Sequence, residues 1–331
     1  MAEPLGASAG TPGSKRGAIA MTLGISYRRH LIGAMTVAAL IVSAPMAIAQ
    51  PSERQARFRA GIEEAVKALD NVPKLKKMSP EAKRQLVEFV LGNTLFVMAH
   101  EMGHALMYEM NMPVLGREED AADSFAVVTA LQIGTGFSER VLLEAAKGWV
   151  LSAKRDKKQG NALAFYDEHG LDLQRSYNVV CLMIGSDPEK YKTLAADTKL
   201  PEERQTSCVR DYKTTTWSWE EMLKPHMRAA DKPKVTIDVK YEDDKKYAVQ
   251  AKILRDMGLL DALAAHAADR YVWPKPFSMV AKSCGDPNAT WNIGTKTLTL
   301  CYELANEFIE LYAGYSKALP AKFRGKPRAS R

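Results

Sequence analysis

The stretch that decides the fold is Val97-Met98-Ala99-His100-Glu101-Met102-Gly103-His104-Ala105-Leu106. It contains the pattern H-E-x-x-H, in which two histidines stand four positions apart. On an α-helix of 3.6 residues per turn, positions i and i+4 lie on one face, so His100 and His104 can bind one Zn²⁺ through neutral imidazoles. Glu101 lies beside that face, where a carboxylate can take a proton from metal-bound water and later return it.

A long helix is expected to carry this pattern. Ser79-Pro80-Glu81 is a strong helix opening, because serine caps the first turn and proline is tolerated there. Apolar residues then recur at helical spacing as far as His100. Asn111-Met112-Pro113 predicts the end of the helix.

A second helix begins in the acidic segment that follows. Acidic residues favour a helix N-terminus through its dipole, and this accounts for Glu118 and Asp120. Glu119 and Asp123, four apart, share a face with the small residue Ala122, so a close helix–helix approach would carry a carboxylate to the metal. The pattern E-x-x-A-D therefore predicts Glu119 as the third zinc ligand and Asp123 as a carboxylate that orients a histidine ligand.

A third histidine, His169, precedes another expected helix, which carries Arg175. A lone histidine is more often structural than catalytic. However, Asp167 and Glu168 stand next to this one and could raise its pKa. A histidine and an arginine near a zinc-bound oxyanion would be useful donors, so His169 and Arg175 are candidate catalytic residues.

The first 49 residues have the pattern of a leader with a signal peptide. Arg28 and Arg29 precede the apolar run 31–43, and Ala47-Ile48-Ala49 supplies a small-x-small cleavage site before Gln50. Translation could start at Met1 or Met21. An uncleaved membrane anchor is the alternative, because 31–49 is barely long enough to span. We expect an exported bacterial protein, periplasmic or secreted, with no stable membrane span after cleavage.

Four cysteines follow the leader, and an even number in an exported chain indicates disulfides. Three pairings are possible. Local order favours Cys181 with Cys208 and Cys284 with Cys301, each closing a short loop. A cysteine-ligated zinc site is the alternative, but the spacings include no C-x-x-C.

The composition fits a globular protein: of 331 residues, 46% are hydrophobic and 26% charged, which argues against global disorder. We predict a predominantly helical α+β fold: a zincin-like catalytic domain over 50–230 with a small β element, and a C-terminal α/β segment over 231–318 that packs on it. Short helices are expected over 201–230, one helix over 243–270, and a hairpin over 288–302 followed by a helix. The basic tail, 319–331, is expected to be a solvated terminus rather than a nucleic-acid surface.

The chain resembles the bacterial family catalogued as domain of unknown function 4344, which groups candidate zinc metallopeptidases. The resemblance covers most of residues 85–310 and implies a zinc-dependent enzyme acting on a peptide or protein substrate. In the family's arrangement the N-A … C-Y-E element precedes H-E-x-x-H, whereas here it follows, so the resemblance assigns no role to Asn288 or Tyr302. The matching stretches are F-V-M-A-H-E-M-G-H-A-L (96–106), P-V-L-G-R-E-E-D-A-A-D-S-F-A (113–126), D-E-H-G-L-D-L-Q-R-S-Y-N-V-V-C (167–181), G-S-D-P (185–188), C-G-D-P-N-A (284–289) and L-C-Y-E-L (300–304).

The order of motifs is also similar to that of CAAX prenyl protease-type gluzincins. There H-E-x-x-H is followed by E-x-x-A-D and then by a histidine with an arginine six residues on. The late pair faces the substrate and the transition-state oxygen in those enzymes, and the resemblance implies this role for His169 and Arg175. Their membrane helices have no counterpart in this sequence.

Three functions are compatible with these motifs. The first is an exported zinc metallopeptidase in which Glu101 activates water. The others are an exported zinc-binding interaction module without catalysis, and a zinc hydrolase of a non-peptide amide. Glu101 favours an enzyme, because a purely structural zinc site needs no general base.

Overall fold

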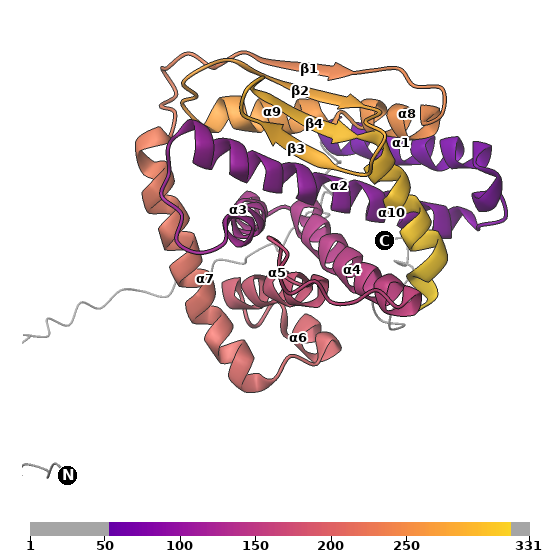
Figure 1. Ribbon diagram of the computed structural model, residues 1–331, viewed down its shortest axis with the longest axis horizontal. Helices are drawn as coiled ribbons and strands as arrows, with labels where there is room; N and C mark the ends of the chain where they lie inside the picture. The colour runs from indigo at the N-terminus through magenta and orange to yellow at the C-terminus, as the bar shows by residue number, and fades with distance from the viewer. Residues whose placement is uncertain (1–52, 319–331) are drawn as a thin grey trace, which may run out of the picture. The chain divides into compact units, whose positions relative to one another are not determined.

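The structure is a computed structural model that describes residues 53–318, with side chains over 60–317. The expected leader and basic tail lie outside these residues. The fold is α+β and predominantly helical, as predicted, with one four-stranded sheet lying along the longest helix (Figure 1). The helices are α1 (Glu53–Ala68), α2 (Pro80–Glu109), α3 (Glu118–Ile133), α4 (Gly136–Gln159), α5 (Asp172–Ser186), α6 (Lys192–Thr198), α7 (Glu202–Leu223), α8 (Ala248–Asp256), α9 (Leu259–Arg270) and α10 (Tyr302–Tyr315). The 3-10 turns are η1 (Leu69–Asn71), η2 (Pro73–Leu75), η3 (Lys224–His226) and η4 (Ser316–Ala318), and the strands are β1 (Ile237–Tyr241), β2 (Phe277–Lys282), β3 (Ala289–Asn292) and β4 (Thr297–Cys301).

Helix α2 lies at the centre of the described fold. It begins as predicted: the Ser79 Oγ accepts a hydrogen bond from the Ala82 N–H at 3.2 Å, and Pro80 occupies the first helical position. It ends before Asn111, which has a positive φ of 49°. Helices α1, α3, α4 and α10 and strand β3 all pack on α2, so this helix contacts elements from most of the described chain.

The sheet has the strand order β1-β2-β4-β3. None of its strands lies within residues 53–230, so the small β element expected in that part of the chain was placed too early. Strands β1, β2 and β4 run parallel, and β3 pairs antiparallel with β4. The expected hairpin over 288–302 is therefore confirmed as β3 and β4. Strand β2 was not predicted, although Phe277, Met279 and Ala281 alternate with less buried residues as a half-buried strand requires. Because β3 is an edge strand beside α2, it borders the H-E-x-x-H segment.

Two helical predictions in the second half were wrong. Residues 202–223 form one helix, α7, instead of several short ones, because no glycine or proline interrupts them and Cys208, Trp219 and Leu223 fall on one buried face. The helix expected over 243–270 is divided into α8 and α9. Gly258 adopts the left-handed conformation at φ 58°, which residues with a Cβ rarely adopt, and so breaks the helix.

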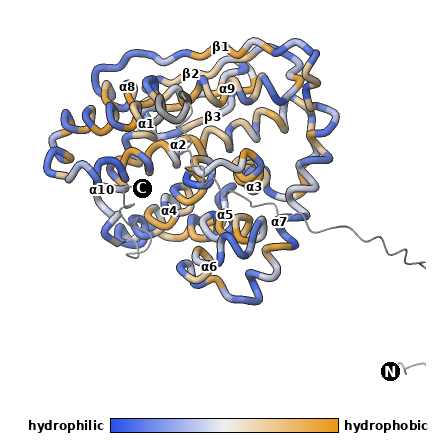
Figure 2. The backbone as a smooth tube through the Cα atoms, turned by 180° about the vertical axis from the view of Figure 1, so that it is seen from behind, coloured by the Kyte–Doolittle hydropathy of each residue, from blue (hydrophilic) through white to orange (hydrophobic). Residues whose placement is uncertain are grey.

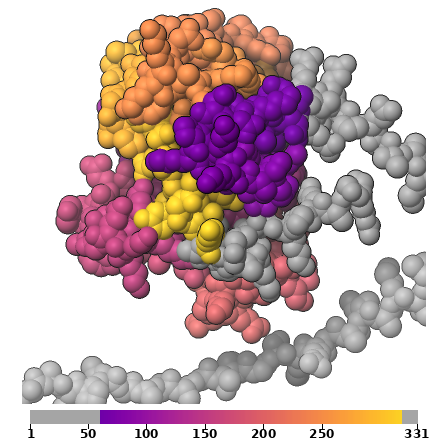
Figure 3. Space-filling model, turned by 90° about the vertical axis from the view of Figure 1, so that its right-hand side faces the viewer, coloured from indigo at the N-terminus to yellow at the C-terminus, as the bar shows by residue number. Residues whose placement is uncertain are grey.

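Two apolar cores hold the helices together. One joins α1, α2 and the sheet to α8, α9 and α10, and Figure 3 shows α1 lying against C-terminal segments. The other lies among α3, α4, α5 and α6, where Figure 2 shows recurrent hydrophobic stretches. The domain division at residue 230 stays a prediction. Among the described residues, no helix is long and apolar enough to cross a membrane.

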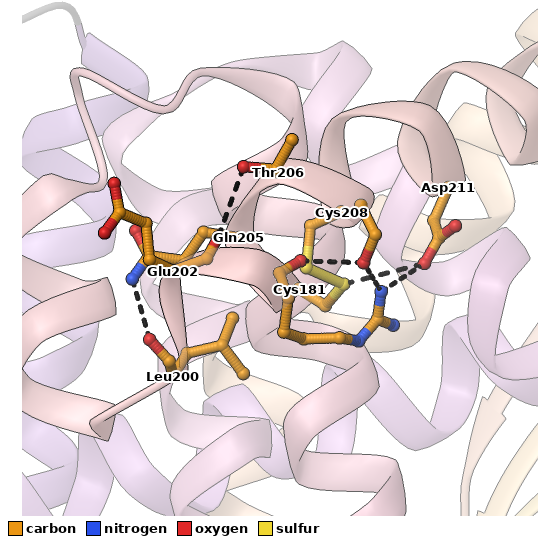
Figure 4. Close-up of a disulfide and its surroundings, with 9 residues drawn as sticks. Cys181, Leu200, Glu202, Gln205, Thr206, Cys208 and Asp211 are labelled. Carbon is orange, nitrogen blue, oxygen red and sulfur yellow. Dashed lines mark hydrogen bonds and ion pairs between the residues drawn. A yellow bond between two sulfur atoms is a disulfide. The ribbon is translucent and has the colours of Figure 1, made fainter.

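Both expected disulfides are present. Cys181–Cys208 joins α5 to α7 with the Cα atoms 5.2 Å apart, and the Asp211 carboxylate lies beside it (Figure 4). Gly185 allows this close approach, because a Cβ there would lie 2.1 Å from the Cys208 carbonyl oxygen. Cys284–Cys301 joins the loop before β3 to the end of β4, with the Cα atoms 5.4 Å apart.

The carboxylate of Glu303, in the first turn of α10, also fixes the loop before β3. It accepts hydrogen bonds from the Ser283 hydroxyl and from the backbone N–H groups of Cys284 (3.0 Å) and Gly285 (2.8 Å). Burial raises the pKa of Glu303, but these donors outweigh it and lower the pKa to about 2. The ionised carboxylate therefore stabilises the fold.

We expect Glu303→Gln to lower the free energy of unfolding at pH 7 by about 1–3 kcal/mol. Because the folded-state pKa lies below the unfolded value of about 4.3, the stabilisation is present above that value and is lost as the pH falls toward 2. Urea unfolding followed by circular dichroism at pH 7 and pH 3 measures both effects. Glu310→Gln, on the exposed side of α10, is the control, with an expected change within about 0.5 kcal/mol. Equal losses in the two variants would contradict the role given to Glu303.

Candidate metal centre

His100 and His104 point the same way from α2, with their Nε2 atoms 3.1 Å apart. Glu119, in the first turn of α3, reaches them from the facing helix. Its Oε2 lies 2.9 Å from Nε2 of His100 and 3.3 Å from Nε2 of His104. The three donor atoms lie within 4.8 Å of one another, so one ion can contact all of them. Two imidazoles and one carboxylate are the donors that a catalytic zinc ion takes, with a fourth position left open.

The close approach of α2 to α3 depends on Gly103 and Ala122. A Cβ added at Gly103 would lie 3.1 Å from the Ala122 Cα and 3.3 Å from the Phe125 ring. These distances are at the limit of ordinary packing, so a larger residue at position 103 would push the helices apart. The middle of the H-E-x-x-H motif therefore sets how near Glu119 comes to the histidines.

Each of the two histidines of the H-E-x-x-H segment has a carboxylate at its Nδ1 atom. Nδ1 of His100 lies 2.8 Å from Oδ1 of Asp123, and Nδ1 of His104 lies 2.7 Å from Oε1 of Glu118. A carboxylate at Nδ1 holds the proton there, which leaves Nε2 free to bind a metal. Asp123 was predicted for this task from its spacing, whereas the helix dipole alone was expected to account for Glu118. The position of Glu118 directly before Glu119 was the sequence feature that could have indicated this contact with His104.

Arg175 is buried behind Asp123. Its Nε donates to Oδ2 of Asp123 at 2.8 Å and its Nη2 to Oδ1 at 2.7 Å, while its guanidinium lies 3.7 Å from the centre of the Trp149 ring. Asp123 therefore stands between Arg175 and His100. These contacts direct the guanidinium to Asp123, and its positive charge is also near enough to oppose protonation of His169.

His169 reaches the centre from the loop between α4 and α5. Its Nε2 lies 2.9 Å from Oε2 of Glu119. The Asp167 carboxylate lies 3.2 Å from its Nδ1 and also accepts its backbone N–H at 2.8 Å. Half of the imidazole remains exposed, and Asp167 fixes its orientation. The sequence analysis gave Asp167 no orienting role, although its position two residues before His169 allows the turn that makes this contact.

Glu101 links the centre to the edge strand. Its Oε2 accepts a hydrogen bond from the backbone N–H of Trp291 in β3 at 2.9 Å. Asn288 and Tyr302 lie next to the same hairpin. The Asn288 Oδ1 accepts the Ala289 N–H, and the Tyr302 hydroxyl donates to the Glu242 carbonyl at 2.6 Å. These two hydrogen bonds do not involve the donor residues of the centre. The carboxylate that could act as a base and the strand that could hold an extended chain therefore touch.

The charges of the centre are strongly coupled. Burial opposes protonation of His100, but Asp123 and Glu119 outweigh it and raise its pKa to about 9. Burial raises the pKa of Glu119, but hydrogen bonds from the imidazoles outweigh it and hold that pKa far below the usual range. Burial raises the pKa of Glu101, despite opposing effects of the two histidines and the Trp291 N–H. Glu119 is therefore ionised at neutral pH, as a metal ligand must be, while Glu101 holds a proton more readily than an exposed glutamate.

A family model described as "Putative metallopeptidase", domain of unknown function 4344, matches residues 59–223 and 240–325. The chain belongs to this family. The matched ranges contain the two ligand histidines, Glu119, His169 and the β3–β4 hairpin. Neither the curated proteins nor the solved structures contain a significant match to the chain. A metallopeptidase requires a metal, and the donor set of His100, His104 and Glu119 fits one.

His104→Ala should abolish metal binding at this candidate centre. Loss of one of three protein ligands leaves two donors, and we expect metal content to fall from about one ion per chain to a small fraction of that. Metal analysis of the mature protein after dialysis against buffer with trace Zn²⁺ measures the change. His226→Ala, in η3, is the control and should keep the metal. Full metal content in His104→Ala would contradict the ligand set.

Gly103→Ala should weaken both the fold and the metal centre. The added methyl group meets the Ala122 backbone, and we expect a loss of about 1–3 kcal/mol in unfolding free energy together with a weaker metal affinity. Gly314→Ala, in α10, is a matched control, because a Cβ there meets nothing within 4 Å. Its stability should stay level or rise by up to about 1 kcal/mol. Unfolding curves and metal titrations measure the two effects, and unchanged metal affinity in Gly103→Ala would contradict the proposed helix approach.

Proposed function

We propose that this protein is an exported zinc-dependent metallopeptidase that hydrolyses peptide bonds with Glu101 as the general base. The observation that carries the proposal is the position of Glu101. It adjoins the metal donors and touches the edge strand β3 through the Trp291 N–H. Bound at His100, His104 and Glu119, Zn²⁺ would polarise the scissile carbonyl and lower the pKa of water.

Glu101 takes the proton of the attacking water and delivers it to the leaving amine. Its raised pKa, caused by burial, supports both steps, because the group must hold the proton between them. A purely structural zinc site would have no use for this carboxylate. The preference for an enzyme over a non-catalytic module rests on that argument.

His169 donates from Nε2 to the oxygen on which negative charge develops. The hydrogen bond to Glu119 raises the pKa of His169, which favours the doubly protonated ring that this donation needs. Asp167 accepts from Nδ1 and keeps the ring turned toward the centre. Arg175 acts through Asp123, whose carboxylate it fixes, and so serves as a positioning residue.

The substrate backbone pairs with the outer edge of β3, where the Trp291 N–H that donates to Glu101 in this structure would turn to the substrate. This strand lies between β4 and α2 (Figure 1). On the side of α2, its Trp291 N–H donates to Glu101. An extended peptide added at that edge would lie along the centre, and main-chain hydrogen bonds would hold it without regard to sequence. The scissile bond would then be presented to Glu101 and His169.

The assignment of zinc and the assignment of export have separate support. Two imidazoles and one carboxylate with an open position are the ligands of catalytic zinc in metallopeptidases. Two disulfides and the expected signal peptide support an oxidising compartment outside the cytoplasm.

The test compares Glu101→Gln with the wild-type mature protein. Because Glu101 is not a ligand, we expect the variant to keep its metal and to lose at least about 100-fold in kcat/KM. Cleavage of a broad peptide library, read by mass spectrometry, measures activity, and metal analysis measures loading. Glu88→Gln, earlier in α2, is the control and should retain both. A metal-loaded wild type that cleaves no peptide would contradict the proposal and favour an interaction module or a non-peptide amide as substrate.

A further inference from the structure

We propose that the enzyme selects extended, unfolded polypeptide segments that carry bulky apolar side chains, and that the loop bearing His169 recognises them. The inference rests on the proposed function and names its substrate class. The recognising surface consists of Leu163, Phe165 and Tyr166, called here the apolar loop surface.

The apolar loop surface is unusually exposed. The relative exposed areas are 64% for Leu163, 79% for Phe165 and 93% for Tyr166. These residues lie in the connection between α4 and α5, whose polar members Asp167 and His169 form the contacts near the metal centre. Apolar side chains that gather in water mark an interaction site.

The apolar loop surface belongs to the same loop as His169. Phe165 stands four residues before His169, a separation of at most about 14 Å along an extended chain. The loop is shorter than that limit, because the Asp167 N–H donates to the Ala164 carbonyl at 3.1 Å and the His169 N–H donates to Asp167. Since Nε2 of His169 contacts Glu119, the backbone of Phe165 stays within about 14 Å of a residue that reaches the centre.

A further exposed aromatic residue lies on the helix side of the centre. Tyr108 follows His104 by four positions in α2, so it lies one turn further along the same helix face, and it is 54% exposed. Apolar surface therefore borders the centre on α2 as well as on the loop. A chain bound at the centre would have apolar surface available on two sides.

The edge strand and the apolar surface together select unfolded chains. Pairing with β3 requires an extended backbone, and contact with the loop strengthens the binding of large apolar side chains. Folded proteins bury such side chains and pair their own strands, so they offer neither feature. An unfolded segment of an exported protein offers both.

The experiment measures binding with the full mature protein carrying Glu101→Gln and loaded with Zn²⁺. The probes are two fluorescein-labelled peptides of equal length and charge, one with phenylalanine and one with serine at the central positions. We expect the phenylalanine peptide to bind at least about tenfold more tightly. Adding Phe165→Ser and Tyr166→Ser should reduce this preference to within about twofold. Trp217→Ser, which removes an aromatic residue 63% exposed on α7, should leave it unchanged.

Three outcomes would overturn the inference. In the first, the Glu101→Gln protein binds the two peptides equally or not at all. In the second, the variant with Phe165→Ser and Tyr166→Ser added still prefers the phenylalanine peptide. In the third, that variant loses only its binding to anionic phospholipid vesicles. The last outcome would make the apolar loop surface a membrane contact. If the wild-type enzyme cleaves both peptides with equal kcat/KM, the result supports the proposed peptidase function and contradicts the proposed selectivity for apolar side chains. If the wild type cleaves neither peptide while selective binding is observed, the result contradicts the proposed peptidase function and supports the recognition of apolar side chains.

Discussion

The close packing of α2 on α3 at Gly103 and Ala122 is the constraint on which the centre depends. Donor atoms on two helices can share one ion only if the backbones approach closely, because glutamate and histidine side chains are short. At this crossing a single added methyl group would meet backbone at 3.1 Å. The same approach sets Asp123 against His100 and Glu118 against His104, so ligand and orienting contacts have one structural origin.

A row of buried charges extends from this crossing into the helical core. Glu119, His100, Asp123 and Arg175 follow one another at hydrogen-bond distance, and Trp149 covers the guanidinium. Burying an ion is costly unless its partners satisfy it, and here both Asp123 oxygens have partners. Helix α5 must therefore stay where it holds Arg175, and the Cys181–Cys208 disulfide ties that helix to α7. The disulfide thus supports the metal centre although it lies away from it.

The sequence predicted those parts of the centre that depend on local periodicity. His100 and His104 follow from helical spacing, Glu119 and Asp123 from a second spacing on one helix, and the two disulfides from local order. Glu118 and Asp167 were not recognised as orienting groups, because their contacts depend on how far side chains reach across an interface or within an irregular loop. Arg175 was expected to face the substrate, and in the structure its guanidinium donates to Asp123. Spacing along one helix does not show whether a side chain points to a substrate or to a neighbouring helix. Strand β2 and the division of α8 from α9 depend on tertiary pairing and on one left-handed glycine.

The contact between Glu101 and Trp291 joins residues 190 positions apart, and it connects chemistry to substrate binding. Its geometry depends on the hairpin, which is held by the Cys284–Cys301 disulfide and by Glu303. The Trp291 N–H lowers the pKa of Glu101, whereas burial raises it. A chain bound along β3 would exclude water from the carboxylate and strengthen the effect of burial. Under the proposed function, occupation of the edge strand would therefore raise the pKa of Glu101 further while a peptide bond is in place.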